Sequence, residues 1–163
     1  MNTLWFYWGQ PHLSYLRWLT LWSARQVHDD ITLITPRVAV RPHVPWKEQQ
    51  DFQYAPTGTN YLPRVAKLGI KQVDLEDIAR EIALLQAPDI HTADMLKWWL
   101  LAEHGGTVAD MDILFLKPLP PITNDVHVTV FTAHPRAGYL PVTFMQGRPS
   151  TVWRTSYRNA LRN

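Results

Sequence analysis

The stretch that decides the fold spans residues 88–118 and reads PDIHTADMLKWWLLAEHGGTVADMDILFLKP. Its opening Pro-Asp pair is typical of a helix start, and the run 95–102 is apolar nearly all round, which predicts a buried helix. Gly105 and Gly106 are expected to end this helix. The β-branched and apolar run 107–116 that follows predicts a strand.

Two carboxylates, Asp110 and Asp112, interrupt this apolar run. Side chains two residues apart lie on the same side of an extended backbone, so we predict that both point into one site. Burying them is costly unless a positive group compensates, and a metal ion does this most simply. Mg²⁺ and Mn²⁺ take oxygen ligands, commonly one or two carboxylates plus the phosphates of a substrate. The pair alone is also compatible with two side chains that merely face water or cap a turn.

A wider pattern surrounds the pair. The predicted helix contains a small residue, an aspartate, two apolar residues and a lysine in succession. After the helix, two glycines and a short apolar run precede the two carboxylates. A further apolar run then ends at Lys-Pro-Leu. The residues of this pattern are Ala93, Asp94, Met95, Leu96, Lys97, Gly105, Gly106, Asp110, Asp112, Lys117, Pro118 and Leu119.

This pattern resembles the core signature of the Asp-x-Asp sugar-binding glycosyltransferases, the group that includes the yeast initiating mannosyltransferase and the catalytic domains of the large clostridial glucosylating toxins. Two positions differ from the group: Lys97 stands where arginine is usual, and Val108 stands where tyrosine is usual. A lysine keeps the positive charge but loses the two-pronged hydrogen bonding of a guanidinium.

The resemblance implies an α/β domain of the GT-A type, with a mostly parallel central sheet flanked by helices. It also implies metal-dependent transfer of a sugar from a UDP- or GDP-sugar to a glycan, lipid or protein acceptor, with retention of anomeric configuration. Asp110 and Asp112 would hold Mn²⁺ or Mg²⁺ and, with Lys97 at the phosphates, form the catalytic set. Asp94 would accept hydrogen bonds from sugar or ribose hydroxyls, and Asp110 would also contact the donor through water or ribose.

The start of the chain extends the same resemblance. A predicted strand at 4–8, a helix at 12–27 and a strand at 31–35 follow each other, as in an α/β nucleotide-binding unit. In the resembling group an aromatic residue at the end of the first strand packs on the nucleobase, which points to Trp8, with Tyr7 as the alternative. Trp8 is equally compatible with an ordinary core position.

The remaining elements are predicted from composition. They are a strand at 70–75, a helix at 76–85, strands at 126–132 and 140–145, and a terminal helix at 150–162. We expect one domain over 1–163, with a nucleotide-sugar-binding part at 1–118 and a short acceptor-side part at 119–163. His134, which follows one of these strands, is a candidate third metal ligand.

The composition excludes several classes of protein. The chain has no cysteine, so disulfide frameworks, thiolate catalysis and cysteine zinc sites are ruled out. No apolar stretch reaches the length of a membrane span, and the short apolar run near the start lacks the features of a signal peptide. We therefore expect a soluble, cytoplasmic protein.

Charge is unevenly distributed along the chain. Residues 74–112 hold nine acidic and two basic residues, which suits cation binding, whereas residues 113–163 hold six basic residues and one acidic residue. In the terminal helix, Arg154, Arg158 and Arg162 fall on one face, beside an apolar line that includes Trp153 and Tyr157. This arrangement suits peripheral contact with an anionic membrane surface, and it is equally compatible with a solvated face.

Two other classes of function compete with the enzyme. One is a non-catalytic module that binds a sugar nucleotide or glycan. The other is a basic adaptor for nucleic acid or a membrane surface that works through the terminal helix. The net charge of +2 says little in itself, and we expect no nucleic-acid partner.

Overall fold

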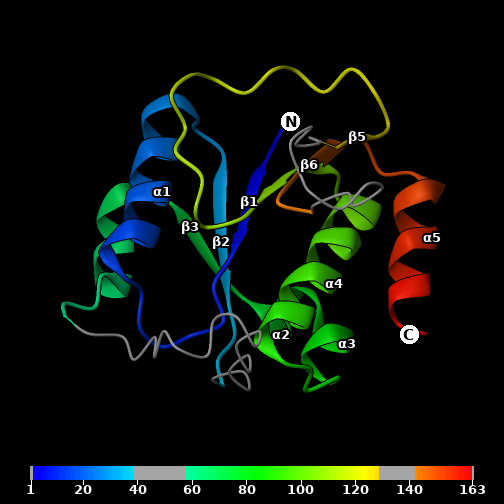
Figure 1. Cartoon of the computed structure of the whole chain (residues 1–163), viewed down its shortest axis with the longest axis horizontal. Coiled ribbons are helices and arrows are strands. Elements are labelled where there is room, and N and C mark those ends of the chain that lie inside the picture. Colours follow the sequence, from blue (N-terminus) through cyan, green and yellow to red (C-terminus); the bar gives the residue numbers. More distant parts are fainter. Residues whose placement is uncertain (1, 39–57, 129–141, 163) are drawn as a thin grey trace, which may run out of the picture.

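The computed structural model describes residues 2–38, 58–128 and 142–162, and in it helices cover both faces of one sheet (Figure 1). The strands are β1 (Leu4–Tyr7), β2 (Ile31–Thr35), β3 (Lys71–Asp74), β4 (Gly106–Ala109), β5 (His127–Val128) and β6 (Phe144–Gly147). The α-helices are α1 (Tyr15–Val27), α2 (Leu75–Ile78), α3 (Arg80–Ala83), α4 (Asp89–Glu103) and α5 (Thr151–Ala160), and a 3₁₀ helix, η2, spans Leu62–Leu68.

The described strands form one sheet in the order β3-β2-β1-β4-β6-β5. β1 pairs in parallel with β2 and β4, and β2 pairs in parallel with β3. β6 runs antiparallel to β4, and β5 runs antiparallel to β6. The four parallel strands therefore end at one edge of the sheet, where α/β proteins bind their ligands. The predicted α/β class, with a mostly parallel sheet flanked by helices, is confirmed.

Two apolar cores lie on opposite faces of the sheet. Phe6 packs on one face with residues of α1 and η2, including Leu21 and Val65. The other face packs against α3, α4 and α5 and includes Leu100 and Trp153. Successive residues of β1 alternate between the two cores because strand side chains point to opposite faces. Tyr7 and Trp8 consequently lie on different sides of the sheet.

The predicted glycine stop is confirmed, and Gly106 is required by close packing. α4 ends at Glu103, and Gly105 and Gly106 then take φ values of +67° and +105°, which disfavour side chains with a Cβ. A Cβ on Gly106 would lie 2.5 Å from the carbonyl oxygen of Thr3. The glycines let the chain turn from α4 directly into β4 beside β1.

The strand after these glycines is shorter than predicted, because β4 ends at Ala109. Beyond it, the chain is bound to α1: the Thr20 hydroxyl donates to the Met111 carbonyl oxygen at 3.0 Å. The backbone N–H of Phe115 donates to the Ser23 hydroxyl at 3.1 Å. Met111 and Phe115 are therefore buried beside a helix rather than in a longer strand, whereas Leu114 and Leu116 are exposed.

The other predicted elements differ mainly at their ends. The expected helix at 76–85 is two short helices, because Ala79 leaves helical geometry with φ −137° and ψ 55°. The strand expected at 140–145 begins later, at Phe144. Of the strand expected at 126–132, β5 contains two residues, and residues 129–132 lie outside the described part of the chain. The remaining predicted strands and helices are confirmed to within a few residues.

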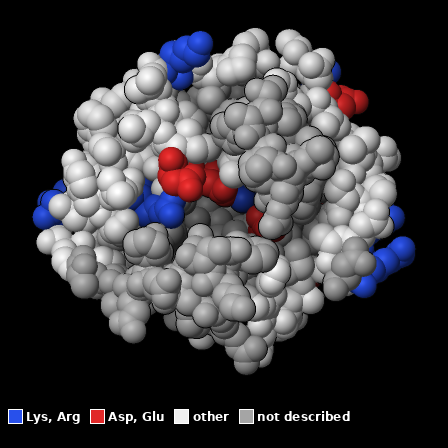
Figure 2. Space-filling model, in the orientation of Figure 1, with Lys and Arg blue, Asp and Glu red and all other residues white. Residues whose placement is uncertain are grey.

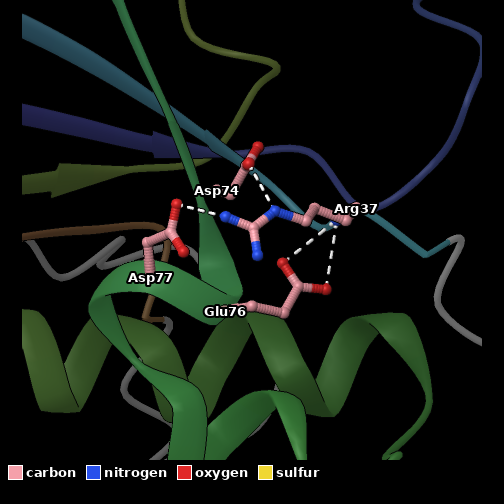
Figure 3. A network of polar contacts seen from close by, with 4 residues as sticks. All are labelled: Arg37, Asp74, Glu76 and Asp77. Carbon is pink, nitrogen blue, oxygen red and sulfur yellow. Dashed lines mark hydrogen bonds and ion pairs between the residues drawn. The ribbon is translucent and has the colours of Figure 1, made fainter.

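A polar network joins the ends of β2 and β3 to the start of α2 (Figure 3). Arg37 Nε donates to Asp74 Oδ2 at 2.7 Å, and the Arg37 guanidinium also pairs with Asp77. The backbone N–H of Arg37 donates to both carboxylate oxygens of Glu76 at 3.1 Å. Because the Arg37, Asp74 and Asp77 side chains are about half exposed, we expect this network to position the loop after β2 more than to stabilise the fold.

No helix among the described residues is long and apolar enough to cross a membrane.

Candidate functional site

A cavity of about 250 Å³ opens at the carboxyl ends of β1 and β4, between α1 and α4. Its walls include Trp8, Lys97, Asp110 and Asp112, four of the residues singled out from the sequence. On the face of the molecule shown in Figure 2, acidic and basic side chains gather around a hollow. Lys97, Asp110 and Asp112 therefore meet at the edge of the sheet that the topology marks for ligand binding, whereas Asp94 is not among the residues that line the cavity.

Asp110, the first residue after β4, is held on the α4 side of the cavity. Its backbone N–H donates to the Thr143 carbonyl oxygen at 2.8 Å. Its carboxylate lies 2.5 Å from Lys97 Nζ, and the same ammonium lies 3.2 Å from Asp94 Oδ1. The Lys97 side chain is only 9% exposed, so its charge is shared between two carboxylates with little access to water.

Two effects act on the pKa of Asp110 in opposite directions. Burial raises the pKa, and the Lys97 ammonium lowers it by attraction and hydrogen bonding. The nearby charges of Asp112 and Asp94 raise it again, and the net result is a pKa above the ordinary range for aspartate. The carboxylate is thus a crowded acidic group that a further cation would stabilise.

Asp112 lies on the α1 side of the cavity, in a turn rather than a strand. The expectation that an extended backbone aligns it with Asp110 is wrong, because β4 ends before either residue. Asp112 Oδ2 lies 3.5 Å from Arg17 Nη1, and the Arg17 guanidinium lies 6.0 Å from the centre of the Trp8 ring. With 62% of its side chain exposed, Asp112 is the more accessible of the two carboxylates.

Trp8 is half-buried, and its position fits both predicted roles. It packs against the core formed with α1 and also lines the cavity. Its Nε1 donates to the His12 carbonyl oxygen at 3.1 Å, which fixes the ring orientation. Tyr7, the predicted alternative, lines the same cavity from the α4 side.

Three polar features of the cavity escaped sequence analysis. Arg17 is one and Asp89, in the first turn of α4, is another. The third is Gln10, which is not in the cavity lining but whose Nε2 donates to Asp89 Oδ2 at 2.9 Å. Arg17 carried a weak signal, as a charge between apolar residues of a predicted helix. Asp89 appeared only as a helix-start residue, because nothing in the sequence shows that the start of α4 faces the end of β1.

Few of the described side chains are placed to ligate a metal ion. Among the described residues, no group of three or more histidine, aspartate or glutamate side chains surrounds a common point, and His134 lies outside the described ranges. Asp110 and Asp112 fit an ion that takes its remaining ligands from substrate phosphates and water, as Mg²⁺ commonly does. An ion held by protein side chains alone does not fit the described residues.

One of three comparisons with known proteins, the one with solved structures, finds a similar fold. No protein-family model matches the chain, and no curated protein sequence matches it. Among solved structures, the chain is similar to one titled "PaToxG Glycosyltransferase", with a TM-score of 0.67 and 15% sequence identity. The alignment covers 99% of this chain and 60% of that one. The chain therefore has a glycosyltransferase-like α/β fold, and it spans about three-fifths of the length of this structural neighbour.

Proposed function

We propose that the protein is a glycosyltransferase that takes its sugar from a nucleoside-diphosphate sugar. The observation that carries this proposal is the cavity at the carboxyl edge of the parallel strands of a glycosyltransferase-like fold, where Asp110 pairs with Lys97 and Asp112 pairs with Arg17. The Asp-x-Asp signature in the sequence supports the glycosyltransferase class independently of the structure. A UDP- or GDP-sugar as donor, and retention of anomeric configuration, are further parts of the proposal that rest on the sequence resemblance.

The charges around the cavity support metal dependence. Among the described residues here, the carboxylates of Asp89, Asp94, Asp110 and Asp112 outnumber the cations of Arg17 and Lys97. A diphosphate brings more negative charge into this acidic site. A bound Mn²⁺ or Mg²⁺ would offset the charge that builds on the leaving diphosphate.

The proposed roles of the side chains follow from where they lie. Asp112, accessible and on the open side, would be the principal metal ligand, with Asp110 beside it. Lys97 keeps Asp110 in place and offers its remaining hydrogen-bonding capacity to the donor. Asp94, 40% exposed and held by Lys97, would accept hydrogen bonds from sugar or ribose hydroxyls. Trp8 would provide a face for the base.

The proposal specifies the acceptor of the sugar only as a glycan, a lipid or a protein. Peripheral contact with an anionic membrane through α5 is supported less than the sequence implied. Trp153 is buried at the interface with α4, and the exposed Arg154 pairs with Glu103 of α4 at 3.4 Å. Arg158, one turn further along α5, is also exposed.

A second candidate function is favoured by one observation. Asp110 and Asp112 each already have a cation within the protein, so these two carboxylates are charge-paired without a metal. A module that binds a sugar nucleotide without turning it over would need only a cavity with these paired charges, and no metal ion.

Screening nucleoside-diphosphate sugars with Mn²⁺ or with a chelator tests both functions. Thermal shift reports binding, and release of nucleoside diphosphate reports turnover. Binding with turnover supports the transferase, and binding without turnover supports the module. Absence of both, together with salt-sensitive binding to polyanions, would support the basic adaptor instead.

A further inference from the structure

The outer face of α1 exposes apolar side chains to solvent. The inner face of this helix packs Leu21 and Ala24 into the core, yet on the outer side Leu16 is 71% exposed. Leu116, 89% exposed, extends the apolar surface, because it follows the residue whose N–H bonds to the α1 side chain of Ser23. We name this surface the α1 patch. It consists of Tyr15, Leu16, Leu19, Trp22, Leu114 and Leu116, of which Leu19 is half-buried and the others are exposed.

The helical repeat gathers the α1 members of the patch into one stripe. At 3.6 residues per turn, Tyr15, Leu16, Leu19 and Trp22 fall within an arc of about 120°. An amphipathic helix normally turns such a stripe toward the core, and α1 already has a separate buried face. A helix that is apolar on two sides calls for a second apolar environment, and large exposed apolar patches mark interaction sites.

Cations border the α1 patch on both sides. The rings of Tyr15 and Tyr61, the residue before η2, have centroids 5.4 Å apart, and the Arg64 guanidinium lies 4.6 Å from the centre of the Tyr61 ring. Lys67 is also on η2, and Lys117 follows the apolar segment on the other side. All three cations are exposed, and none takes part in an ion pair with another described residue.

The carboxylates nearest the α1 patch already have partners. Asp112 pairs with Arg17, and Asp29 pairs with Arg25. In the view of Figure 2, acidic side chains gather at the central hollow. Outside that hollow, the side of the molecule where α1 lies in Figure 1 shows basic side chains and no acidic ones. The surroundings of the patch therefore favour an anionic partner.

This combination of side chains fits a lipid bilayer better than a protein. Tryptophan, tyrosine and leucine with arginine and lysine around them are typical of protein surfaces that lie in the headgroup region. Lysine is depleted from protein–protein interfaces, whereas two of the three bordering cations are lysines. A helix face flanked by cations can lie flat on a membrane, with its apolar side chains between the headgroups.

We propose that the α1 patch docks the protein on an anionic membrane surface. Trp22 and the leucines enter the headgroup region, and Arg64, Lys67 and Lys117 meet the lipid phosphates. This surface is distinct from α5, whose apolar line is buried against α4 at Trp153. Because Arg17, the neighbour of Leu16, lines the cavity, docking places the cavity beside the headgroups. The membrane contact stands whether or not the protein is a transferase.

The test is cosedimentation of the full chain with vesicles, without donor or metal. Wild-type protein should bind vesicles of equal parts phosphatidylcholine and phosphatidylserine roughly tenfold or more tightly than vesicles of phosphatidylcholine alone. Added salt should weaken binding to the mixed vesicles without abolishing it, because the apolar contribution is not screened.

Two double variants separate the apolar and charged contributions. Leu16→Ser with Leu116→Ser should weaken binding to the mixed vesicles roughly tenfold or more, because two leucine side chains no longer leave water. Lys67→Gln with Lys117→Gln should weaken binding to the mixed vesicles by about tenfold and leave binding to phosphatidylcholine unchanged. All four positions are exposed, and circular dichroism checks that each variant folds. If the serine variant does not fold, the glutamine variant and the salt series carry the test.

Matched controls lie at the C-terminal helix: Val152→Ser with Leu161→Ser, and Arg158→Gln with Arg162→Gln, all at exposed positions. Neither control should change vesicle binding. Weakening by the controls but not by the α1 variants would assign the contact to α5 and overturn the proposal.

Two other results would also overturn the proposal. One is the absence of vesicle binding by wild-type protein. The other is self-association, seen by analytical ultracentrifugation without vesicle binding and abolished by Leu16→Ser with Leu116→Ser, which would mean that a second copy covers the patch. Because the assay contains no sugar nucleotide, vesicle binding without turnover would uphold this inference while contradicting the enzyme. Turnover without vesicle binding would do the reverse.

Discussion

At the scale of single residues, the site is built from paired opposite charges. Asp110 pairs with the buried Lys97, and Asp112 pairs with the partly exposed Arg17. The premise that these carboxylates require a metal for compensation is thus incomplete, since the protein supplies a cation to each. What separates the two is exposure: Asp112 is accessible to an incoming ion, and Asp110 is confined.

Asp112→Asn tests the metal ligand directly. The substitution keeps size and shape but removes the charge, so Mn²⁺-dependent donor binding and turnover should both be lost. Unfolding free energy without ligand should change by less than about 0.5 kcal/mol, because the pair with Arg17 is largely exposed to solvent. Calorimetric titration of the donor, with and without Mn²⁺, measures the first effect, and denaturant unfolding measures the second. Donor binding that keeps its wild-type metal dependence would remove Asp112 from the site.

Arg17→Gln should raise the affinity for Mn²⁺ and lower the affinity for the sugar-nucleotide donor. If Asp112 binds a metal as proposed, Arg17 competes with that metal for Asp112 and, once released, is free to pair with the diphosphate of the donor. Without it, Mn²⁺ alone should bind more tightly, while the donor should lose about 1.5 to 3 kcal/mol of binding free energy. Electron paramagnetic resonance of free Mn²⁺ and donor titration give the two values. Arg154→Gln, at an exposed ion pair on α5, is the matched control. A fall in both affinities would show that Arg17 does not compete for Asp112.

At the scale of elements, α4 and β4 are joined through Lys97. The sequence predicted α4, the start of β4 and their glycine connection correctly, because each depends on local pattern: an apolar helix, a Gly-Gly stop and a β-branched run. The end of β4 was not predictable, since the following residues leave the sheet and form hydrogen bonds with a distant helix: Thr20 donates to Met111, and Phe115 donates to Ser23. Side chains with distant partners, such as Arg37, were likewise invisible in the sequence.

A double-mutant cycle measures the link between α4 and β4. Lys97→Met leaves Asp110 and Asp94 as neighbouring carboxylates without their shared cation, so it should lower the unfolding free energy by about 1 to 3 kcal/mol. Adding Asp110→Asn removes the uncompensated charge. The double variant should therefore lose less unfolding free energy than the two single variants lose in total, by at least about 0.5 kcal/mol. Urea unfolding of the four proteins in a chelator gives the coupling. Strict additivity would show that Lys97 and Asp110 do not depend on each other.

At the scale of the whole molecule, the sheet topology brings together site residues that are distant in sequence. Strands β1 and β4 lie about a hundred residues apart in sequence, yet they are neighbours in the sheet and end at the same edge. The strand and helix order predicted this edge as the ligand position. It did not predict that α1 and the start of α4 would close the two sides with Arg17 and Asp89, because such approaches depend on helix packing across the sheet and not on local pattern.

The charge of the assembled cavity gives a prediction for the stability of the entire fold. If donor and metal bind together, each offsets charge that hinders the other, so either alone should stabilise the protein little. Together, at a hundredfold excess over the dissociation constant, they should raise the unfolding free energy by about 2.7 kcal/mol. Thermal unfolding with a UDP- or GDP-sugar, Mn²⁺, both or neither measures this dependence. Asp74→Asn, in the polar network at the end of β3, should keep the response, and Asp112→Asn should lose it. Full stabilisation by the donor in a chelator would mean that Arg17 and Lys97 suffice for the diphosphate, and metal dependence would then be wrong.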